Sequence, residues 1–280
     1  MPYLVVPAAG LGKRMKRVNP DLPKELLPLA GMPVIHYALE EAITAELRDV
    51  IIIIGPHKEV LRRYIEEPAF RKSICKDPTR AERVIYSLRI HFLYQMEPTG
   101  EADAIALAEE ITAGEDIAIL YPDNVHIPPG QALRHLYQVY KNCGHDVIGL
   151  TRMTAPLARA TSNAGRVRLN PYKEGLFIIR EFLPKGPGHF ILREKNEMRT
   201  CGFSIAGPHI YRYIERARRF HREGEFIDIA FRALMVKEKT ILGVPLPGLV
   251  YDVGNPEGYR LCDKKLSSLT ASSKAERPLH

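Results

Sequence analysis

The residues best suited to chemistry near the start of the chain are two glycines and a group of cations that follow a short apolar run. Gly10 and Gly12 come directly after that run, and Lys13, Arg14 and Lys24 follow them. Glycine lets backbone N–H groups approach a phosphate with no side chain in the way, and arginine offers a forked set of donors to phosphate oxygens. The combination predicts a binding site for a polyphosphate.

Two familiar phosphate-binding loops do not match this stretch. The dinucleotide fingerprint requires a third glycine three residues after Gly12, where the chain has Met15. The P-loop requires serine or threonine after Gly-Lys, where the chain has Arg14. The missing third glycine also argues against a nicotinamide-dependent oxidoreductase.

Two aspartates are candidate ligands for a metal ion. Asp123 follows the apolar run 117–120, so its carboxylate is expected to point into a cleft at the end of a strand. Asp252 lies in a second turn-like segment, Asp-Val-Gly-Asn-Pro. Carboxylate and phosphate oxygens suit Mg²⁺, which keeps several waters and takes one or two protein ligands. Taken singly, each segment is also compatible with an ordinary turn.

A third segment after a predicted strand could contact a nucleobase. Gln95 opens it and Gly100 follows five positions later. A side-chain amide carries both a donor and an acceptor, so it can pair with the edge of a pyrimidine, and glycine would let backbone groups come close. A plain strand-to-helix connection is the alternative interpretation.

Short apolar runs alternate with helix-like segments in the first half of the chain. The run 50–54 is apolar at every position, as expected for a strand covered on both faces. This alternation predicts an α/β fold with a Rossmann-like, doubly wound and mostly parallel sheet, in which ligands bind at the carboxyl ends of the strands. The predicted strands are 4–8, 50–54, 90–95, 117–120 and 147–151, and the predicted helices are 33–45, 58–66, 102–110 and 131–141.

The character of the sequence changes after Thr151, where short β-like segments alternate with loops rich in glycine, proline and lysine. Predicted strands are 165–169, 175–182, 200–206, 240–244 and 249–252, and predicted helices are 208–221, 227–237 and 256–264. We expect one domain over residues 1–266, made of halves 1–151 and 152–266, followed by a polar tail at 267–280 that frays.

The overall composition is that of an ordinary globular protein. The chain has 280 residues, of which 45% are hydrophobic and 26% charged, and the formal net charge is +7. Its basic residues are scattered rather than arranged in a stripe with aromatics, which argues against a nucleic-acid partner. No apolar run suits a membrane span, the chain begins with a strand rather than a secretory leader, and its four cysteines are far apart. These features predict a cytoplasmic protein with reduced thiols.

Two stretches together resemble the signature of the sugar-phosphate nucleotidyltransferases. Ala9-Gly10-Leu11-Gly12-Lys13-Arg14 resembles that family's A-G-x-G-x-R, and Pro23-Lys24-Glu25-Leu26-Leu27-Pro28 resembles its P-K-x-[LM]-[LM]-P. The family usually has threonine or serine where this chain has Lys13. The segments around Gln95, Asp123 and Asp252 also resemble family motifs and occur in the family's order.

The resemblance implies a fold of the nucleotide-diphospho-sugar transferase type and a role for each motif. The first half would bind the nucleotide and the second half the sugar phosphate. Catalytic roles fall to Arg14 and Lys24, Mg²⁺ binding to Asp123 and Asp252, and nucleotide binding to Ala9, Gly10, Gly12, Lys13, Gln95 and Gly100. Glu101 stands where the family usually has threonine or leucine.

The sugar-phosphate motifs match less closely. Gly165 resembles the glycine that lies against the sugar, and Glu181 stands where the family has the Glu of E-K-P. That Glu binds sugar hydroxyls and its Lys binds the sugar phosphate. Here Phe182 occupies the place of the lysine, and Lys185 is the candidate substitute.

The implied reaction transfers a nucleotidyl group from UTP or dTTP to a hexose 1-phosphate, with glucose 1-phosphate favoured, and releases pyrophosphate. No covalent enzyme intermediate is required, so the protein would position the substrates and stabilise charge. The resemblance also implies a homo-oligomer, dimer or tetramer. The alternative is a sugar-nucleotide sensor or regulatory subunit on the same fold, which the missing lysine at Phe182 would favour.

Overall fold

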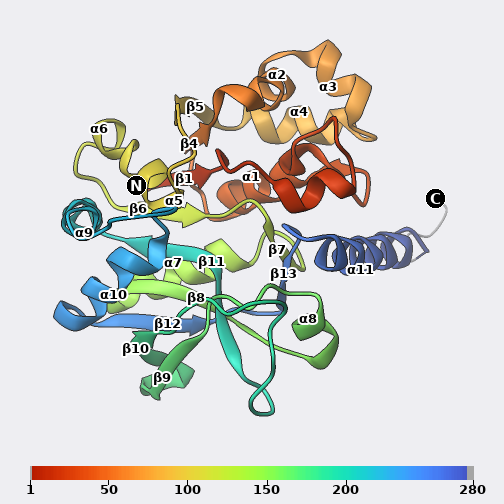
Figure 1. The fold of residues 1–280 in the computed structure, drawn as a ribbon. Helices are drawn as coiled ribbons and strands as arrows, with labels where there is room; N and C mark the ends of the chain where they lie inside the picture. Colours follow the sequence, from red (N-terminus) through yellow and green to blue (C-terminus); the bar gives the residue numbers. More distant parts are fainter. Residues whose placement is uncertain (1, 276–280) are drawn as a thin grey trace.

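A nine-stranded sheet forms the centre of the protein (Figure 1). The computed structural model describes residues 2–275. The strand order is β5-β4-β1-β6-β11-β8-β12-β10-β9, and only β11 and β10 run against the direction of the others. The prediction of a doubly wound, mostly parallel sheet is therefore confirmed. The strands are β1 Tyr3–Pro7, β4 Asp49–Ile54, β5 Arg89–Tyr94, β6 Ile117–Leu120, β8 Asp146–Arg152, β9 Val167–Pro171, β10 Phe177–Phe182, β11 Met198–Ala206 and β12 Ile241–Pro245.

Strand β4 explains why this sheet is covered on both faces. From Val50 to Ile54 every side chain is fully buried. Successive side chains of a strand point to opposite faces, so Ile51 and Ile53 join one apolar cluster while Val50 and Ile52 join the other. Neighbouring β1 shares this arrangement through its parallel register with β4.

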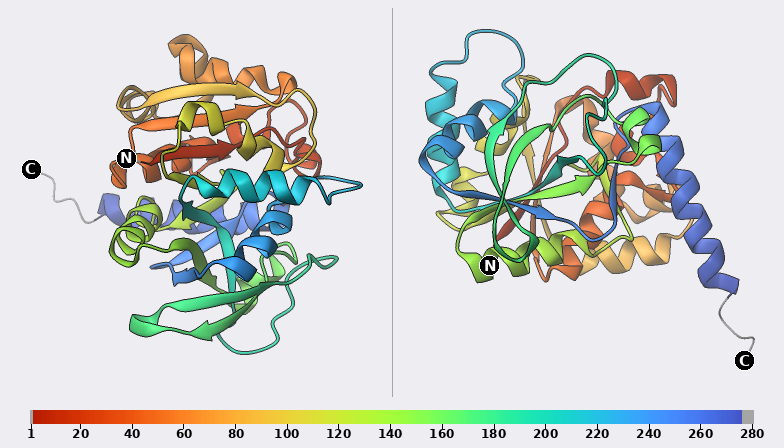
Figure 2. Two further views of the ribbon diagram at one scale, coloured as in Figure 1. Left: turned by 90° about the vertical axis from the view of Figure 1, so that its left-hand side faces the viewer. Right: turned by 90° about the horizontal axis from the view of Figure 1, so that it is seen from below.

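Helices supply the two apolar layers that cover the sheet (Figure 2). The larger cluster takes residues from α1 Val34–Thr44, α2 Glu59–Glu66, α4 Pro78–Tyr86, α7 Ala132–Cys143, α8 Ala155–Arg159 and α11 Pro256–Ala275. The smaller cluster takes residues from α5 Glu101–Ala106, α9 His209–Arg218 and α10 Asp228–Glu238. The carboxyl ends of β1, β4 and β6 open between these two layers.

A separate two-stranded sheet crosses the carboxyl-end side of the main sheet. It pairs β7 Asn124–Ile127 with β13 Leu249–Asp252 in antiparallel register, with Asp252 opposite Asn124. Sequence analysis predicted β13 but not β7, because β7 begins at Asn124, directly after Asp123, and only residues 121–123 separate it from β6. A third sheet pairs β2 Pro28–Leu29 with β3 Met32–Pro33.

Some elements differ from the sequence-based expectation. Helix α11 runs to Ala275, so it continues through much of the segment expected to be a frayed tail; residues 276–280 lie outside the described part of the chain. The short helices α3 Pro68–Ile74, α4, α6 Glu109–Thr112 and α8 were not predicted. Strands from both expected halves share one sheet, and the division at residue 151 stays a prediction. Within residues 2–275, no helix combines the length and the apolar character needed to cross a membrane.

A buried carboxylate joins the first helix to the loop that leads into α7. Glu41 is 3% exposed, and its two oxygens accept hydrogen bonds from the backbone N–H groups of Gly130 and Leu133 at 2.8 and 2.9 Å. Burial raises the pKa of Glu41 to about 7, against the opposing effect of these backbone donors. The Glu41 side chain thus stabilises the loop through two hydrogen bonds, although removing its carboxylate from water costs free energy.

We expect Glu41→Ala to lower the free energy of unfolding by about 2–5 kcal/mol, because two buried N–H groups would lose their acceptor. Urea denaturation at pH 7 measures the change. Glu66→Ala is the control, since the Glu66 carboxylate forms an exposed ion pair with Arg62 on α2, and a pair of that kind contributes about 1 kcal/mol or less. Equal losses in the two variants would contradict this role for Glu41.

Candidate active site

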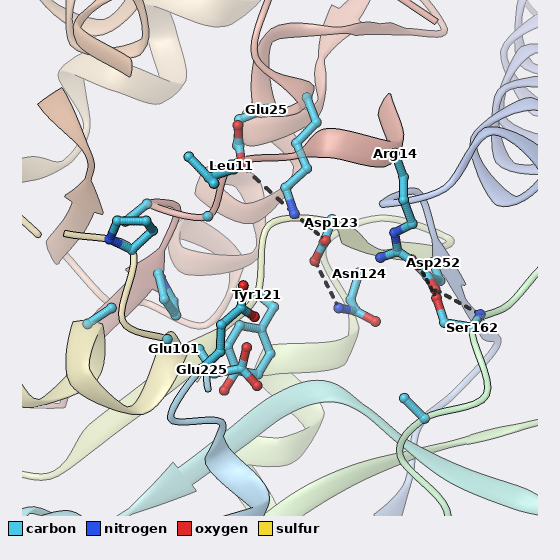
Figure 3. A pocket seen from close by; sticks show the side chains of 18 of the residues that line it. Leu11, Arg14, Glu25, Glu101, Tyr121, Asp123, Asn124, Ser162, Glu225 and Asp252 are labelled. Atoms are coloured by element: carbon cyan, nitrogen blue, oxygen red, sulfur yellow. Dashed lines mark hydrogen bonds and ion pairs between the residues drawn. The ribbon is translucent and has the colours of Figure 1, made fainter. Parts of the chain in front are cut away.

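A cavity of about 250 Å³ lies at the carboxyl ends of the first strands, between the two halves of the sheet. Figure 3 shows Arg14, Asp123, Asn124, Ser162 and Asp252 gathered on one side of it. A second cavity of about 180 Å³ adjoins it and shares part of its lining. Of the residues predicted from sequence, the first cavity is lined by Ala9, Gly10, Arg14, Lys24, Gln95, Gly100, Asp123, Lys185 and Asp252.

The glycine loop lines the cavity with residues 9–11 and then turns sharply at Gly12. Gly12 adopts a left-handed backbone conformation with φ of 60° and precedes the short 3-10 helix Lys13–Arg17. Met15 anchors this helix, because its side chain is only 2% exposed. Arg14 then reaches across the cavity and donates a hydrogen bond to the Ser162 hydroxyl at 2.7 Å. Gly12 and Lys13 are not in the cavity lining, so the loop presents Ala9, Gly10 and Leu11 instead.

Lys24 and Asp123 form the central charged contact. The Lys24 ammonium lies 2.5 Å from Asp123 Oδ2, and both residues line the cavity. Burial alone would lower the pKa of Lys24, but the carboxylates of Asp123, Glu25 and Asp252 outweigh it and raise the pKa. Burial would likewise raise the pKa of Asp123, but Lys24 outweighs it and lowers the pKa. Both groups are therefore charged at neutral pH.

A fully buried ion pair between Lys58 and Glu25 lies next to Lys24. The Lys58 ammonium donates to both oxygens of Glu25 at 2.8 and 2.9 Å and to the carbonyl of Ala8 at 2.6 Å. Side-chain exposure is 2% for Lys58 and 0% for Glu25. The Lys24 ammonium is 4.0 Å from Glu25. Since Lys58 satisfies the Glu25 carboxylate, Lys24 remains directed at Asp123 and the cavity.

The β7–β13 pairing brings Asp252 beside Asp123. Asp252 Oδ2 accepts hydrogen bonds from the backbone N–H and the hydroxyl of Ser162 at 3.1 and 2.7 Å, and Oδ1 accepts one from Gly254 N–H at 3.0 Å. A Cβ at Gly254 would stand 2.6 Å from Asp123 Oδ2 and 3.2 Å from Asp252 Oδ1. The two carboxylates thus face the same small space, and their oxygens are the donor type that Mg²⁺ prefers.

Gln95 and Gly100 lie together on the opposite wall. The Gln95 amide is held by hydrogen bonds from Nε2 to the Gly100 carbonyl at 2.9 Å and the Thr99 hydroxyl at 3.2 Å. Gly100 is needed for a reason that sequence analysis did not foresee. A Cβ there would lie 2.4 Å from the carbonyl oxygen of Phe226, because residues 99–102 exchange backbone hydrogen bonds with Phe226.

The residues predicted to bind the sugar phosphate divide between the cavity and the surface. Gly165 lines the second cavity, and Lys185, although exposed, lines both. Glu181 lies outside both cavities: its side chain is 53% exposed and forms an ion pair with Arg168 at 3.3 Å. Phe182, one residue later on β10, lines the second cavity instead. The binding roles of all these residues stay predictions.

The comparison with known protein families assigns the chain. A family model described as nucleotidyl transferase matches residues 4–267. The chain belongs to this family. The match spans both the glycine loop and the segment that carries Asp252, so it covers every element of the cavity described above.

Relatives and solved structures agree with the assignment to the nucleotidyl transferases. A UTP–glucose-1-phosphate uridylyltransferase of Staphylococcus epidermidis is 27% identical over 262 residues, which cover 91% of this chain and 88% of that protein. A UDP-glucose pyrophosphorylase complexed with UDP-glucose superposes with a TM-score of 0.81 at 22% identity, covering 96% of this chain and 99% of that chain. A UTP-bound UGPase from Acinetobacter baumannii gives 0.76 at 19% identity, covering 99% and 100%. These structures share the fold of this nucleotidyl transferase.

Sequence analysis missed several residues in the cavities of this nucleotidyl transferase. Ser162 holds Asp252 and Arg14, and nothing in its local sequence signals that role. Glu101 lines both cavities, and burial raises its pKa to about 7, with the Asp228 carboxylate adding to the effect. Its unusual identity at that motif position was visible in the sequence, but its neighbour Asp228 comes from the distant helix α10.

We expect Lys58→Met to lower the free energy of unfolding by about 3–5 kcal/mol, because it leaves the Glu25 carboxylate buried without a partner. The uncompensated carboxylate would also draw Lys24 away from the cavity and weaken nucleotide binding. Urea denaturation and nucleoside triphosphate titration measure the two effects.

The double variant Lys58→Met/Glu25→Gln is the matched control. It removes both charges, so it should regain most of the stability and most of the nucleotide affinity. If nucleotide affinity in Lys58→Met equals that of the wild type, Glu25 and Lys58 do not position Lys24.

Proposed function

We propose that this nucleotidyl transferase converts UTP or dTTP and a hexose 1-phosphate to a nucleotide sugar and pyrophosphate. UTP and glucose 1-phosphate are the favoured pair, since the relatives carry those substrates in their names. The observation that carries the proposal is the convergence of Lys24, Asp123 and Asp252 in one cavity beside the glycine loop. That arrangement offers cations for phosphates and carboxylates for a metal ion within a single cavity.

The chemistry requires little more than positioning and charge stabilisation. An oxygen of the sugar phosphate attacks the α-phosphorus in line, a new P–O bond forms, and the bond to pyrophosphate breaks. Lys24 would neutralise charge on the α-phosphate and on the attacking oxygen. Arg14 would neutralise charge on the departing pyrophosphate. Backbone N–H groups around Gly10 would hold the triphosphate.

Asp123 and Asp252 are the residues that would hold Mg²⁺. When bound there, the ion would offset negative charge on the phosphate oxygens. Ser162 and the backbone of Gly254 fix the orientation of the Asp252 carboxylate. Such outer hydrogen bonds orient a ligand and raise its affinity for the metal.

Gln95 would read the base, and this accounts for the choice of a pyrimidine nucleotide. Its Nε2 already donates to the Gly100 carbonyl, so its Oε1 would be the atom that accepts from the N–H that uracil and thymine share. The two bases differ by a methyl group only. The proposal therefore includes both UTP and dTTP. Assembly of this nucleotidyl transferase into dimers or tetramers stays a prediction.

The deciding experiment is pyrophosphate release with Mg²⁺ over a grid of five nucleoside triphosphates and several hexose 1-phosphates. We expect release with UTP or dTTP and one preferred sugar. Omission of Mg²⁺, or addition of a chelator, should abolish it. Binding of UTP without release across the whole grid would overturn the proposal and favour a sugar-nucleotide sensor.

We expect Lys24→Met and Asp252→Asn each to lower kcat by at least about 100-fold, because each removes a charge that acts on the reacting phosphates. Steady-state kinetics with the preferred pair measure the loss. Lys72→Met is the matched control: Lys72 is exposed on α3 and lines neither cavity, so the variant should keep kcat within about 3-fold. A kcat near the wild-type value in either test variant would exclude its assigned role.

A further inference from the structure

Arg199 on β11 is a buried cation with no carboxylate partner among the residues that the structure describes. Its residue exposure is 5%, and its side chain lines the first cavity. Nη1 donates a hydrogen bond to the carbonyl of Thr200 at 3.1 Å. Its Nε and Nη2 are buried and have no hydrogen-bond partner. Among residues 2–275, no carboxylate forms an ion pair with this guanidinium.

Other buried arginines of this protein do not share that condition. Arg166 pairs with Glu197, and Arg232 pairs with Asp228 at 2.8 Å. Removing a cation from water costs free energy unless an anion or a full set of acceptors replaces the water. Among residues 2–275, Arg199 therefore stands out as a buried guanidinium without a carboxylate beside it, and it lines the cavity that an anionic ligand could enter.

The position of Arg199 indicates which part of a bound substrate would supply this negative charge. Arg199 forms an isolated antiparallel bridge with Arg166, and the next residue, Thr200, donates its N–H to the carbonyl of Gly165. A Cβ at Gly165 would lie 3.5 Å from Arg199 Nη1. Arg199 thus borders the start of the sugar-phosphate half, whereas Arg14 and Lys24 approach the cavity from the nucleotide half.

The chain lacks a lysine where the resembled family has one for the sugar phosphate, because Phe182 takes that place. Lys185, the substitute suggested by sequence, lies at the exposed rim. Arg199 is buried, whereas the Lys185 side chain is exposed to solvent. An arginine fork can bind two phosphate oxygens at once.

We propose that Arg199 binds the phosphate of the hexose 1-phosphate and replaces the missing lysine. This rests on the proposed function, because it identifies the anion as the second substrate. Nε and Nη2, which have no acceptor in the protein, would be the donors to the phosphate, while Nη1 keeps its hydrogen bond to the Thr200 carbonyl. Lys185 adds a weaker, solvent-screened attraction at the rim.

The test compares Arg199→Met, Arg199→Lys and the control Lys185→Met. Folding is checked by circular dichroism and thermal denaturation. Arg199→Met should raise the KM for the hexose 1-phosphate by about 10- to 100-fold, as expected for loss of charge-assisted hydrogen bonds, and should leave the KM for UTP within about 2-fold. Arg199→Lys should give an intermediate value because it keeps the charge but loses the fork. Lys185→Met should change the KM by only about 2- to 3-fold.

Direct titration separates this inference from the proposed function. Calorimetry with glucose 1-phosphate, and with glucose as the phosphate-free control, requires no turnover. Wild-type binding that is lost in Arg199→Met supports the inference, whereas equal affinity in the two proteins overturns it while the proposed function stands. A wild type that binds no hexose 1-phosphate overturns both.

A rescue variant tests whether the defect is one of charge rather than of structure. Phe182 lines the adjoining cavity, so Phe182→Lys in the Arg199→Met background restores a cation from the neighbouring wall. It should lower the KM for the hexose 1-phosphate at least about 3-fold relative to Arg199→Met. If Arg199→Met does not fold, Arg199→Lys decides: an unchanged KM for the hexose 1-phosphate overturns the proposal.

Discussion

The contact between Lys24 and Asp123 is the interaction on which the site depends. It brings a cation from the loop after β1 to a carboxylate at the end of β6, and both groups are charged within a buried cavity. Such a contact is stable only if the remaining charges nearby are balanced. The Glu25–Lys58 pair provides that balance from beneath, since it satisfies the carboxylate that would otherwise compete for Lys24. The position of Lys24 and the stability of the protein are therefore coupled in this loop.

The second constraint is the small β7–β13 sheet. It lies outside the main sheet and joins residues that are far apart in the chain, so that Asp252 faces the same space as Asp123. Ser162 then holds both Asp252 and Arg14. One hydroxyl thus connects a predicted metal ligand to the arginine of the glycine loop, which orients the two groups relative to each other before any substrate binds.

The asymmetry between the two halves of the cavity has a physical basis. The half predicted to bind the nucleotide presents its cations from a loop that follows a parallel strand, where the strand end leaves backbone and side chains free. The half predicted to bind the sugar phosphate is built on antiparallel β11 and β10, where neighbouring residues point to opposite faces. A one-position difference on β10 therefore puts Phe182 in the cavity and Glu181 on the surface. Arg199 on β11 is the buried cation that this arrangement leaves available.

The sequence by itself determined the alternation of strands and helices, the two-sided burial of β4, and the glycine loop with Lys24, because these depend on local pattern and on residues close together in the chain. It also placed Asp123 and Asp252 at strand ends. Only the tertiary structure decided which side chains reach the cavity. It excluded Lys13 and Glu181, added Ser162 and Glu101, and extended α11 beyond its expected end. These outcomes depend on contacts between distant segments and on which face of a strand a residue occupies, and neither is specified by residue type alone.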